Sequence, residues 1–176
     1  MKKIVIAAGF AAIASMSATS AMAFDGTVKF TGEILDQACT VDIGTDNTLT
    51  VDLGKVYKTA FTGVGTDAST TKFTIKLKDC PETVTSAKVK FDGAPDTSDS
   101  DLLALDSAAD AASGVAIKLM TADKTALPLH SVNDYSYALS STSENNLDFY
   151  AAYRSTSATV TAGKANSVAN FTVNYN

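Results

Sequence analysis

The side chains that could do chemistry in this sequence are few and poorly grouped. Asp96, Asp99 and Asp101 cluster as calcium ligands do, but the glycine and closing glutamate of a calcium-binding loop are missing. His130 is the only histidine, and no pattern in the sequence positions a serine or cysteine nucleophile for it. We therefore expect a solvated acidic loop, a structural histidine and no enzyme: no catalytic residue, metal or cofactor.

The first 23 residues have the layout of a secretory signal peptide. Lys2 and Lys3 give a positive start, an apolar run covers 4–13, and Ala21-Met22-Ala23 is a small-x-small cleavage site. A transmembrane anchor is the alternative, but the run is shorter than the roughly 20 apolar residues that a bilayer requires. We predict a signal peptide at 1–23, cleavage after Ala23, and secretion.

The predicted secretion bears on whether the two cysteines are free or paired. In an oxidising compartment, two cysteines in a small domain usually pair, so we predict a disulfide between Cys39 and Cys80. Closing a loop of that length stabilises a fold by about 4 kcal/mol in the chain-entropy description. A catalytic or metal-binding thiol is disfavoured because the sequence has no CxxC motif and His130 lies far away along the chain.

Length and composition limit the kind of protein further. The chain has 176 residues, of which 45% are hydrophobic and 19% charged, which suits one folded domain with a core. Its net charge of −5 argues against nucleic acid or an anionic membrane surface as a partner, because both require a basic face.

Alternation of apolar and polar residues predicts an all-β domain made of eight or nine short strands. Many short strands separated by polar turns are typical of a β-sandwich. The stretch 102–112 is ambiguous, because its apolar residues have helical spacing and a short helix is possible. The expected strand-like segments are 24–30, 34–43, 49–53, 73–77, 87–91, 115–119, 135–139, 147–153 and 169–175.

The start of the predicted mature chain is unusual for a terminus. Phe24, Gly26, Val28 and Phe30 share one face of an extended segment, whereas a free tail is normally polar. Such a segment either pairs within its own sheet or adds to the sheet edge of another chain. The residues alone leave these two possibilities open.

Several short motifs together resemble the structural pilins of chaperone–usher fimbriae, in particular the major type 1-like subunits. The resemblance covers the whole mature chain. Gly163 stands fourteenth from the C-terminus, and Tyr175 is the penultimate residue, as in that family. The other matching stretches are Phe24-Asp25-Gly26-Thr27-Val28-Lys29-Phe30-Thr31-Gly32-Glu33-Ile34, Ala38-Cys39-Thr40-Val41-Asp42, Leu77-Lys78-Asp79-Cys80 and Phe171-Thr172-Val173-Asn174-Tyr175-Asn176.

The resemblance implies an incomplete immunoglobulin-like sandwich that lacks its last strand. A groove would remain open between the first strand and the C-terminal strand, and a strand from a neighbouring subunit would complete the fold. Residues 24–32 would be the donor-strand extension and 33–176 the pilin domain. By position in the family, the inserting residues would be Phe24, Gly26, Val28 and Phe30.

The resemblance also implies the partners and the destination of the chain. A periplasmic chaperone would contact the C-terminal strand, an outer-membrane usher would deliver the subunit, and identical or related pilins would form a surface fimbrium. The expected function is that of a structural subunit supporting adhesion. The alternatives are a minor adaptor or terminating subunit, a tip adhesin, or a secreted ligand-binding β-sandwich. The family's chaperone-contacting positions correspond to Gly163, Phe171, Val173 and Tyr175.

Overall fold

The computed structural model describes residues 25–32, 34, 37–44 and 46–176. The predicted signal peptide at 1–23 and Phe24 therefore lie outside the described residues. The chain divides into an N-terminal unit that ends at Ile34 and a compact unit from Leu35 to Asn176, and each is considered by itself. No helix in the described part is long and apolar enough to cross a membrane.

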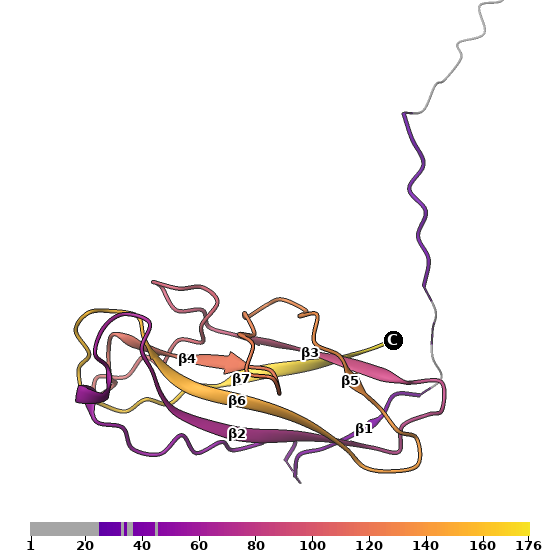
Figure 1. Ribbon diagram of the computed structural model, residues 1–176. Coiled ribbons are helices and arrows are strands. Elements are labelled where there is room, and N and C mark those ends of the chain that lie inside the picture. The colour runs from indigo at the N-terminus through magenta and orange to yellow at the C-terminus, as the bar shows by residue number, and fades with distance from the viewer. Residues whose placement is uncertain (1–24, 33, 35–36, 45) are drawn as a thin grey trace, which may run out of the picture. The chain divides into compact units, whose positions relative to one another are not determined.

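The compact unit is built from two antiparallel sheets (Figure 1). One sheet has the strand order β1-β2-β6-β4, and the other has the order β5-β3-β7. The elements are β1 (Thr40–Asp42), the short 3-10 helix η1 (Lys58–Ala60), β2 (Asp67–Lys78), β3 (Ser86–Gly93), β4 (Val115–Met120), β5 (Tyr137–Ala138), β6 (Asn145–Ser155) and β7 (Ala169–Tyr175).

Alternation along the long strands produces the core between the two sheets. In β3, Val89 and Phe91 are buried, whereas Lys88 and Lys90, which alternate with them, are half-exposed. Phe149 of β6 is fully buried at the centre, stacked on Phe73 with ring centroids 5.5 Å apart and edge-to-face with Phe91 at 5.3 Å. Aromatic pairs in these arrangements contribute about 0.5–1.5 kcal/mol beyond the area that they bury.

The observed strands differ from the sequence prediction in several places. Among the described residues of 34–43 only Thr40–Asp42 is a strand, and of 135–139 only Tyr137–Ala138. Residues 102–112 form no helix; Leu103 instead makes isolated bridges to Pro95 and Ile117. Burial alternates as expected only from Val51 to Leu53, because Leu49 is exposed like Thr50, and residues 49–53 have no ladder partner and are not a strand. The described part of 24–30 is not a strand either, since it has no paired neighbour.

Candidate functional site: the open edge of the sandwich

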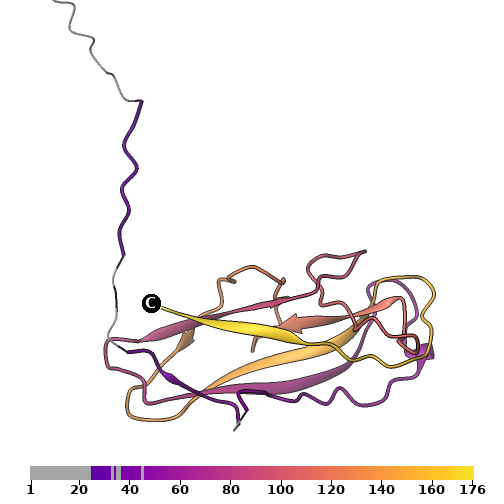
Figure 2. The same cartoon turned by 180° about the vertical axis from the view of Figure 1, so that it is seen from behind.

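Strand β7 is the last strand of its sheet and has a neighbour on one side only. Its seven residues pair with β3, from Ala169 opposite Gly93 to Tyr175 opposite Ala87. On its other side, no described residue forms a backbone hydrogen bond with 169–175. Figure 2 shows this strand, in yellow, at the front. The free side of β7 thus presents unpaired N–H and C=O groups to which a further strand could pair.

The inward side chains of β7 are only partly covered. Phe171, Val173 and Tyr175 pack against the core but stay half-buried. By contrast, Val89, which lies directly opposite Val173 on β3, is fully buried. Strands on both sides normally bury the inward residues of a sandwich strand. The partial burial therefore shows that the core lacks a cover along the free side of β7.

The other wall of this uncovered strip comes from the first part of the compact unit. Val41 of β1, then Ile43 and Val51, pack against the core and are likewise only partly buried. Strand β1 is the edge strand of its own sheet. We call the half-buried residues of the two walls the open edge: Val41, Ile43, Val51, Phe171, Val173 and Tyr175.

A contact at the end of β7 places the two walls on the same side of the sandwich. The hydroxyl of Tyr175 lies near the backbone of Cys39, immediately before β1. Burial raises the pKa of Tyr175, and the nearby Cys39 backbone partly opposes the rise. The open edge therefore lies between the first strand and the C-terminal strand, where the family resemblance implies a groove.

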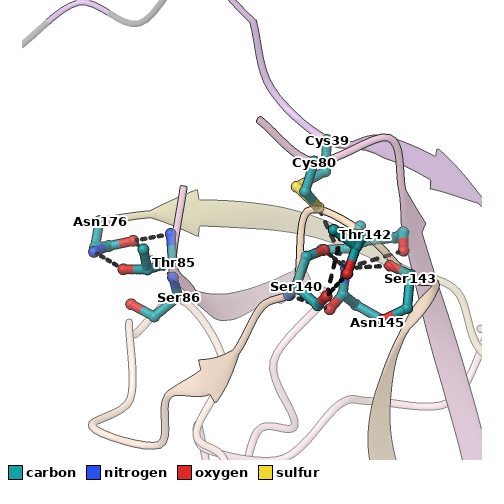
Figure 3. The surroundings of a disulfide bond; sticks show 10 residues. Cys39, Cys80, Thr85, Ser86, Ser140, Thr142, Ser143, Asn145 and Asn176 are labelled. Atoms are coloured by element: carbon teal, nitrogen blue, oxygen red, sulfur yellow. Dashed lines mark hydrogen bonds between the residues drawn. A yellow bond between two sulfur atoms is a disulfide. The ribbon is translucent and has the colours of Figure 1, made fainter. Parts of the chain in front are cut away.

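A side-chain clamp fixes the C-terminal end of β7 (Figure 3). The Asn176 Oδ1 atom accepts hydrogen bonds from the backbone N–H groups of Thr85 (3.1 Å) and Ser86 (2.7 Å). The Asn176 amide nitrogen donates to Thr85 Oγ1 at 2.7 Å. Because Ser86 begins β3, the clamp holds the terminal residue in register on its only strand neighbour. The sequence prediction overlooked Asn176, because nothing local to it signals a partner 91 residues away.

The Cys39–Cys80 disulfide fixes the opposite wall. Strand β1 has three residues and pairs only with β2, so its backbone hydrogen bonds alone would hold it weakly. The disulfide joins Cys39, just before β1, to Cys80, just after β2. The buried Asn145 side chain lies against it, with its amide nitrogen 3.4 Å from Cys80 Sγ and 2.9 Å from the Ser140 carbonyl oxygen (Figure 3).

The N-terminal unit presents apolar side chains to solvent. Val28 is 76% exposed and Phe30 is 90% exposed. Gly26 has open space where a side chain would be. Large apolar side chains exposed together typically mark an interaction site.

Gly163 lies outside β7, six residues before the strand begins, and not on the C-terminal strand where it was expected. Its backbone approaches residues 110–112 so closely that a Cβ atom would collide with the backbone of Ala111 and Ala112. Hydrogen bonds from Lys164 N–H to the Asp110 carbonyl and from Ala112 N–H to the Lys164 carbonyl, both 2.8 Å, hold this contact. Glycine is therefore required here for packing of the loop that leads into β7.

The other residues with reactive side chains serve local structure. Asp96 Oδ1 accepts the backbone N–H of Ser98 at 2.9 Å, within its own loop. His130 Nδ1 lies 3.0 Å from an Asp92 carboxylate oxygen at the surface. The hydrogen bonds with Lys90 and His130 lower the pKa of Asp92. Among the described residues, no group of three His, Cys, Asp or Glu side chains is arranged to hold a metal ion.

A sandwich with one uncovered side, bordered by an edge strand that is paired on one side only, belongs to the class of incomplete β-sandwiches. The sequence model of the family described as fimbrial protein matches residues 28–176. The chain therefore belongs to the fimbrial protein family, and its fold is the incomplete immunoglobulin-like sandwich of the chaperone–usher pilins.

Individual relatives agree with this assignment. The probable major fimbrial subunit LpfA of Escherichia coli O157:H7 is 39% identical over 176 residues, covering 99% of this chain and 97% of that protein. Long polar fimbria protein A of Salmonella typhimurium is 36% identical, with the same coverage. A crystal structure of a type I fimbria protein of Burkholderia pseudomallei is 36% identical, with a TM-score of 0.61 over 85% of this chain and 97% of that one.

Proposed function

We propose that this chain is the structural subunit of a bacterial surface fimbrium and that its copies polymerise by strand donation. The N-terminal segment 24–32 of one copy would insert along the open edge of the next copy and complete its sandwich. The observation that carries this proposal is the half-burial of Phe171, Val173 and Tyr175 above an otherwise buried core.

The two participating segments match in length and pattern. Strand β7 has seven residues, and the alternating face at the N-terminus runs from Phe24 to Phe30, also seven positions. Backbone hydrogen bonds to β7 would supply affinity, and alternate side chains entering the uncovered strip would set the register. Burial of Val28 or Phe30 contributes roughly 1.5–3 kcal/mol each. Gly26 would occupy the point where the strip has no depth for a side chain.

The same open edge explains why the subunit would need help before assembly. An unpaired strand next to exposed apolar side chains invites pairing with the wrong chain. A periplasmic chaperone that covers β7 until the donor segment arrives would prevent this, and an outer-membrane usher would then deliver the subunit to the growing fibre. The predicted signal peptide at 1–23 supports the periplasmic route.

Electron microscopy of surface fibres, with an antibody or tag on this subunit, tests the proposal. A main structural subunit labels the whole shaft, whereas a minor adaptor or terminating subunit labels only one end. The sequence relatives favour the shaft, since a probable major fimbrial subunit and a type-1 fimbrial protein subunit both match over nearly their full length. Absence of label from all fibres would refute the assignment.

A further inference from the structure

The charges on the sheet faces of the compact unit are largely neutralised by ion pairs. Across the face formed by β2 and β6, Lys72 lies 2.8 Å from Asp148, and Lys76 lies 3.0 Å from Glu144. The remaining pairs are Lys78–Asp42, Lys88–Asp134, Lys90–Asp92, Lys118–Asp67, Arg154–Asp67 and Lys164–Asp110.

Two of the three lysines left without an ion pair in the described part of the compact unit lie at one end of the sandwich. Among the described residues from 37 onward, only Lys55, Lys58 and Lys124 have no acidic partner. Lys124 lies over the ring of Tyr150 instead, 5.1 Å from its centroid. Lys55 and Lys58 are exposed and flank or lie in η1, at the end of the sandwich opposite β1 (Figure 1).

The same end exposes apolar side chains. Tyr57 is 84% exposed and Val64 is 67% exposed, both in the loop that carries η1. Their loop is held to the sandwich by the hydrogen bond from Gly65 N–H to the Ser155 carbonyl, 2.8 Å. We call Lys55, Tyr57, Lys58 and Val64 the η1 end. Asp52, three residues before Lys55, is an exposed acid whose Oδ1 accepts the backbone N–H of Gly54 at 2.8 Å, so the positive charge is local to Lys55 and Lys58.

The opposite end is acidic. The turn between β2 and β3 carries Asp79 and Glu82, which are exposed and have no ion pair among the described residues. This turn also holds Cys80, so the acidic turn lies at the disulfide end, and segment 24–32 precedes Cys39 of that disulfide by seven residues in the sequence. Strand β2, twelve residues long, separates the two ends by roughly 36 Å at about 3.3 Å per residue.

We propose that the η1 end of the copy that receives a strand docks against the Asp79–Glu82 turn of the copy that donates it, as a head-to-tail contact between consecutive subunits. The inference rests on the proposed strand donation, because the donor copy must bring its disulfide end to the copy that it enters. The acidic disulfide end of the donor copy would be attracted by the positive η1 end of the other copy, and repelled by the other copy's acidic disulfide end. Head-to-tail contacts of this kind propagate as an open chain, in which each copy's N-terminal segment is available to the copy that it enters.

Charge reversal at each end, alone and combined, tests the contact. Lys55→Glu with Lys58→Glu makes the η1 end acidic, and Asp79→Asn with Glu82→Lys makes the turn basic. Asn replaces Asp79 because the backbone at this position has a φ of 53°, a left-handed conformation that Asp and Asn adopt more readily than most residues. Each pair should slow fibre elongation by the full-length chain roughly tenfold, and high salt should lessen the defect. The combined chain should elongate at nearly the original rate.

Co-expression of the unmodified chain with the chain that carries all four substitutions makes the test more specific. Whichever of the two donates the strand, the η1 end and the turn that meet between them carry charge of the same sign. The two chains, carrying different tags, should form separate fibres. A peptide of residues 24–32 should bind every variant equally, so its binding reports on the open edge alone. Unslowed elongation by the single-end variants, failure of the combined chain to recover, or free mixing would each overturn the docking proposal while strand donation stands. Failure of the peptide to bind the unmodified chain would overturn both.

Discussion

Replacing Val28 with aspartate should distinguish strand donation from any other role of the N-terminal segment. Val28 is 76% exposed in its own chain, so the change costs the free subunit little. In the inserted segment, the valine would contribute roughly 1.5–3 kcal/mol by burial, and a carboxylate there adds a desolvation penalty of at least about 1–3 kcal/mol. The combined loss of about 3 kcal/mol or more corresponds to over a hundredfold weaker binding.

The assay is calorimetric titration of 24–32 peptides into a chain that begins at residue 33. The neighbouring Lys29→Asp peptide is the matched control, because position 29 points to the other face of an extended segment. We expect it to bind within about threefold of the original peptide, since exposed substitutions usually change free energies by less than about 0.5 kcal/mol. Equal weakening by the two changes would show that the alternation has no role. Unchanged binding of Val28→Asp would show that the segment is not the donor.

Three further outcomes are expected. Cys39→Ser should lower the free energy of unfolding by about 2–5 kcal/mol, measured by chemical denaturation, because it frees the three-residue strand β1; a loss below 1 kcal/mol would contradict this. Val89→Ala, at a fully buried site, should destabilise the free chain by about 2 kcal/mol. Val173→Ala, at a half-buried site, should destabilise the free chain by less than about 1 kcal/mol and weaken binding of the 24–32 peptide instead. A larger destabilisation by Val173→Ala than by Val89→Ala in thermal melts would refute the open edge. Burial raises the pKa of Tyr137, whose hydroxyl donates to the Asp148 carbonyl oxygen at 2.6 Å. The stability that the neutral Tyr137 contributes is therefore full below about pH 10 and is lost as the pH rises further. Tyr137→Phe should reduce this alkaline loss of stability in thermal melts recorded over a pH series.

The alternation of apolar and polar residues was enough to predict most of the sandwich, because alternate side chains of each long strand face the core. The segment 49–53 shows the limit. From Val51 to Leu53 its burial alternates as predicted, with Leu53 buried and Asp52 exposed, yet it is not a strand. A strand also needs a hydrogen-bonded neighbour, and this segment borders the side of the sandwich where none is present.

Two other features depended on contacts that no local pattern reveals. Leu102, Leu105 and Ala109 have helical spacing, but Leu103, which breaks that spacing, is buried and bridges to Ile117. The clamp joins Asn176 to Thr85, 91 residues earlier in the sequence. Of the candidate site, the sequence predicted the apolar residues of β7 and the disulfide, and missed the polar group that holds β7 in register.

The pairing of β3 with β7 also has a kinetic consequence. Partners such as Val89 and Val173 are roughly 80 residues apart, and pairings this distant in sequence form slowly because a long loop must close first. Docking of β7 is therefore expected to be a late event in folding. The strand whose free side would receive a donor is then among the last to arrive, so a copy with unfinished folding has no edge to extend. Only a fully folded copy could therefore accept a donor strand and be incorporated into a fibre.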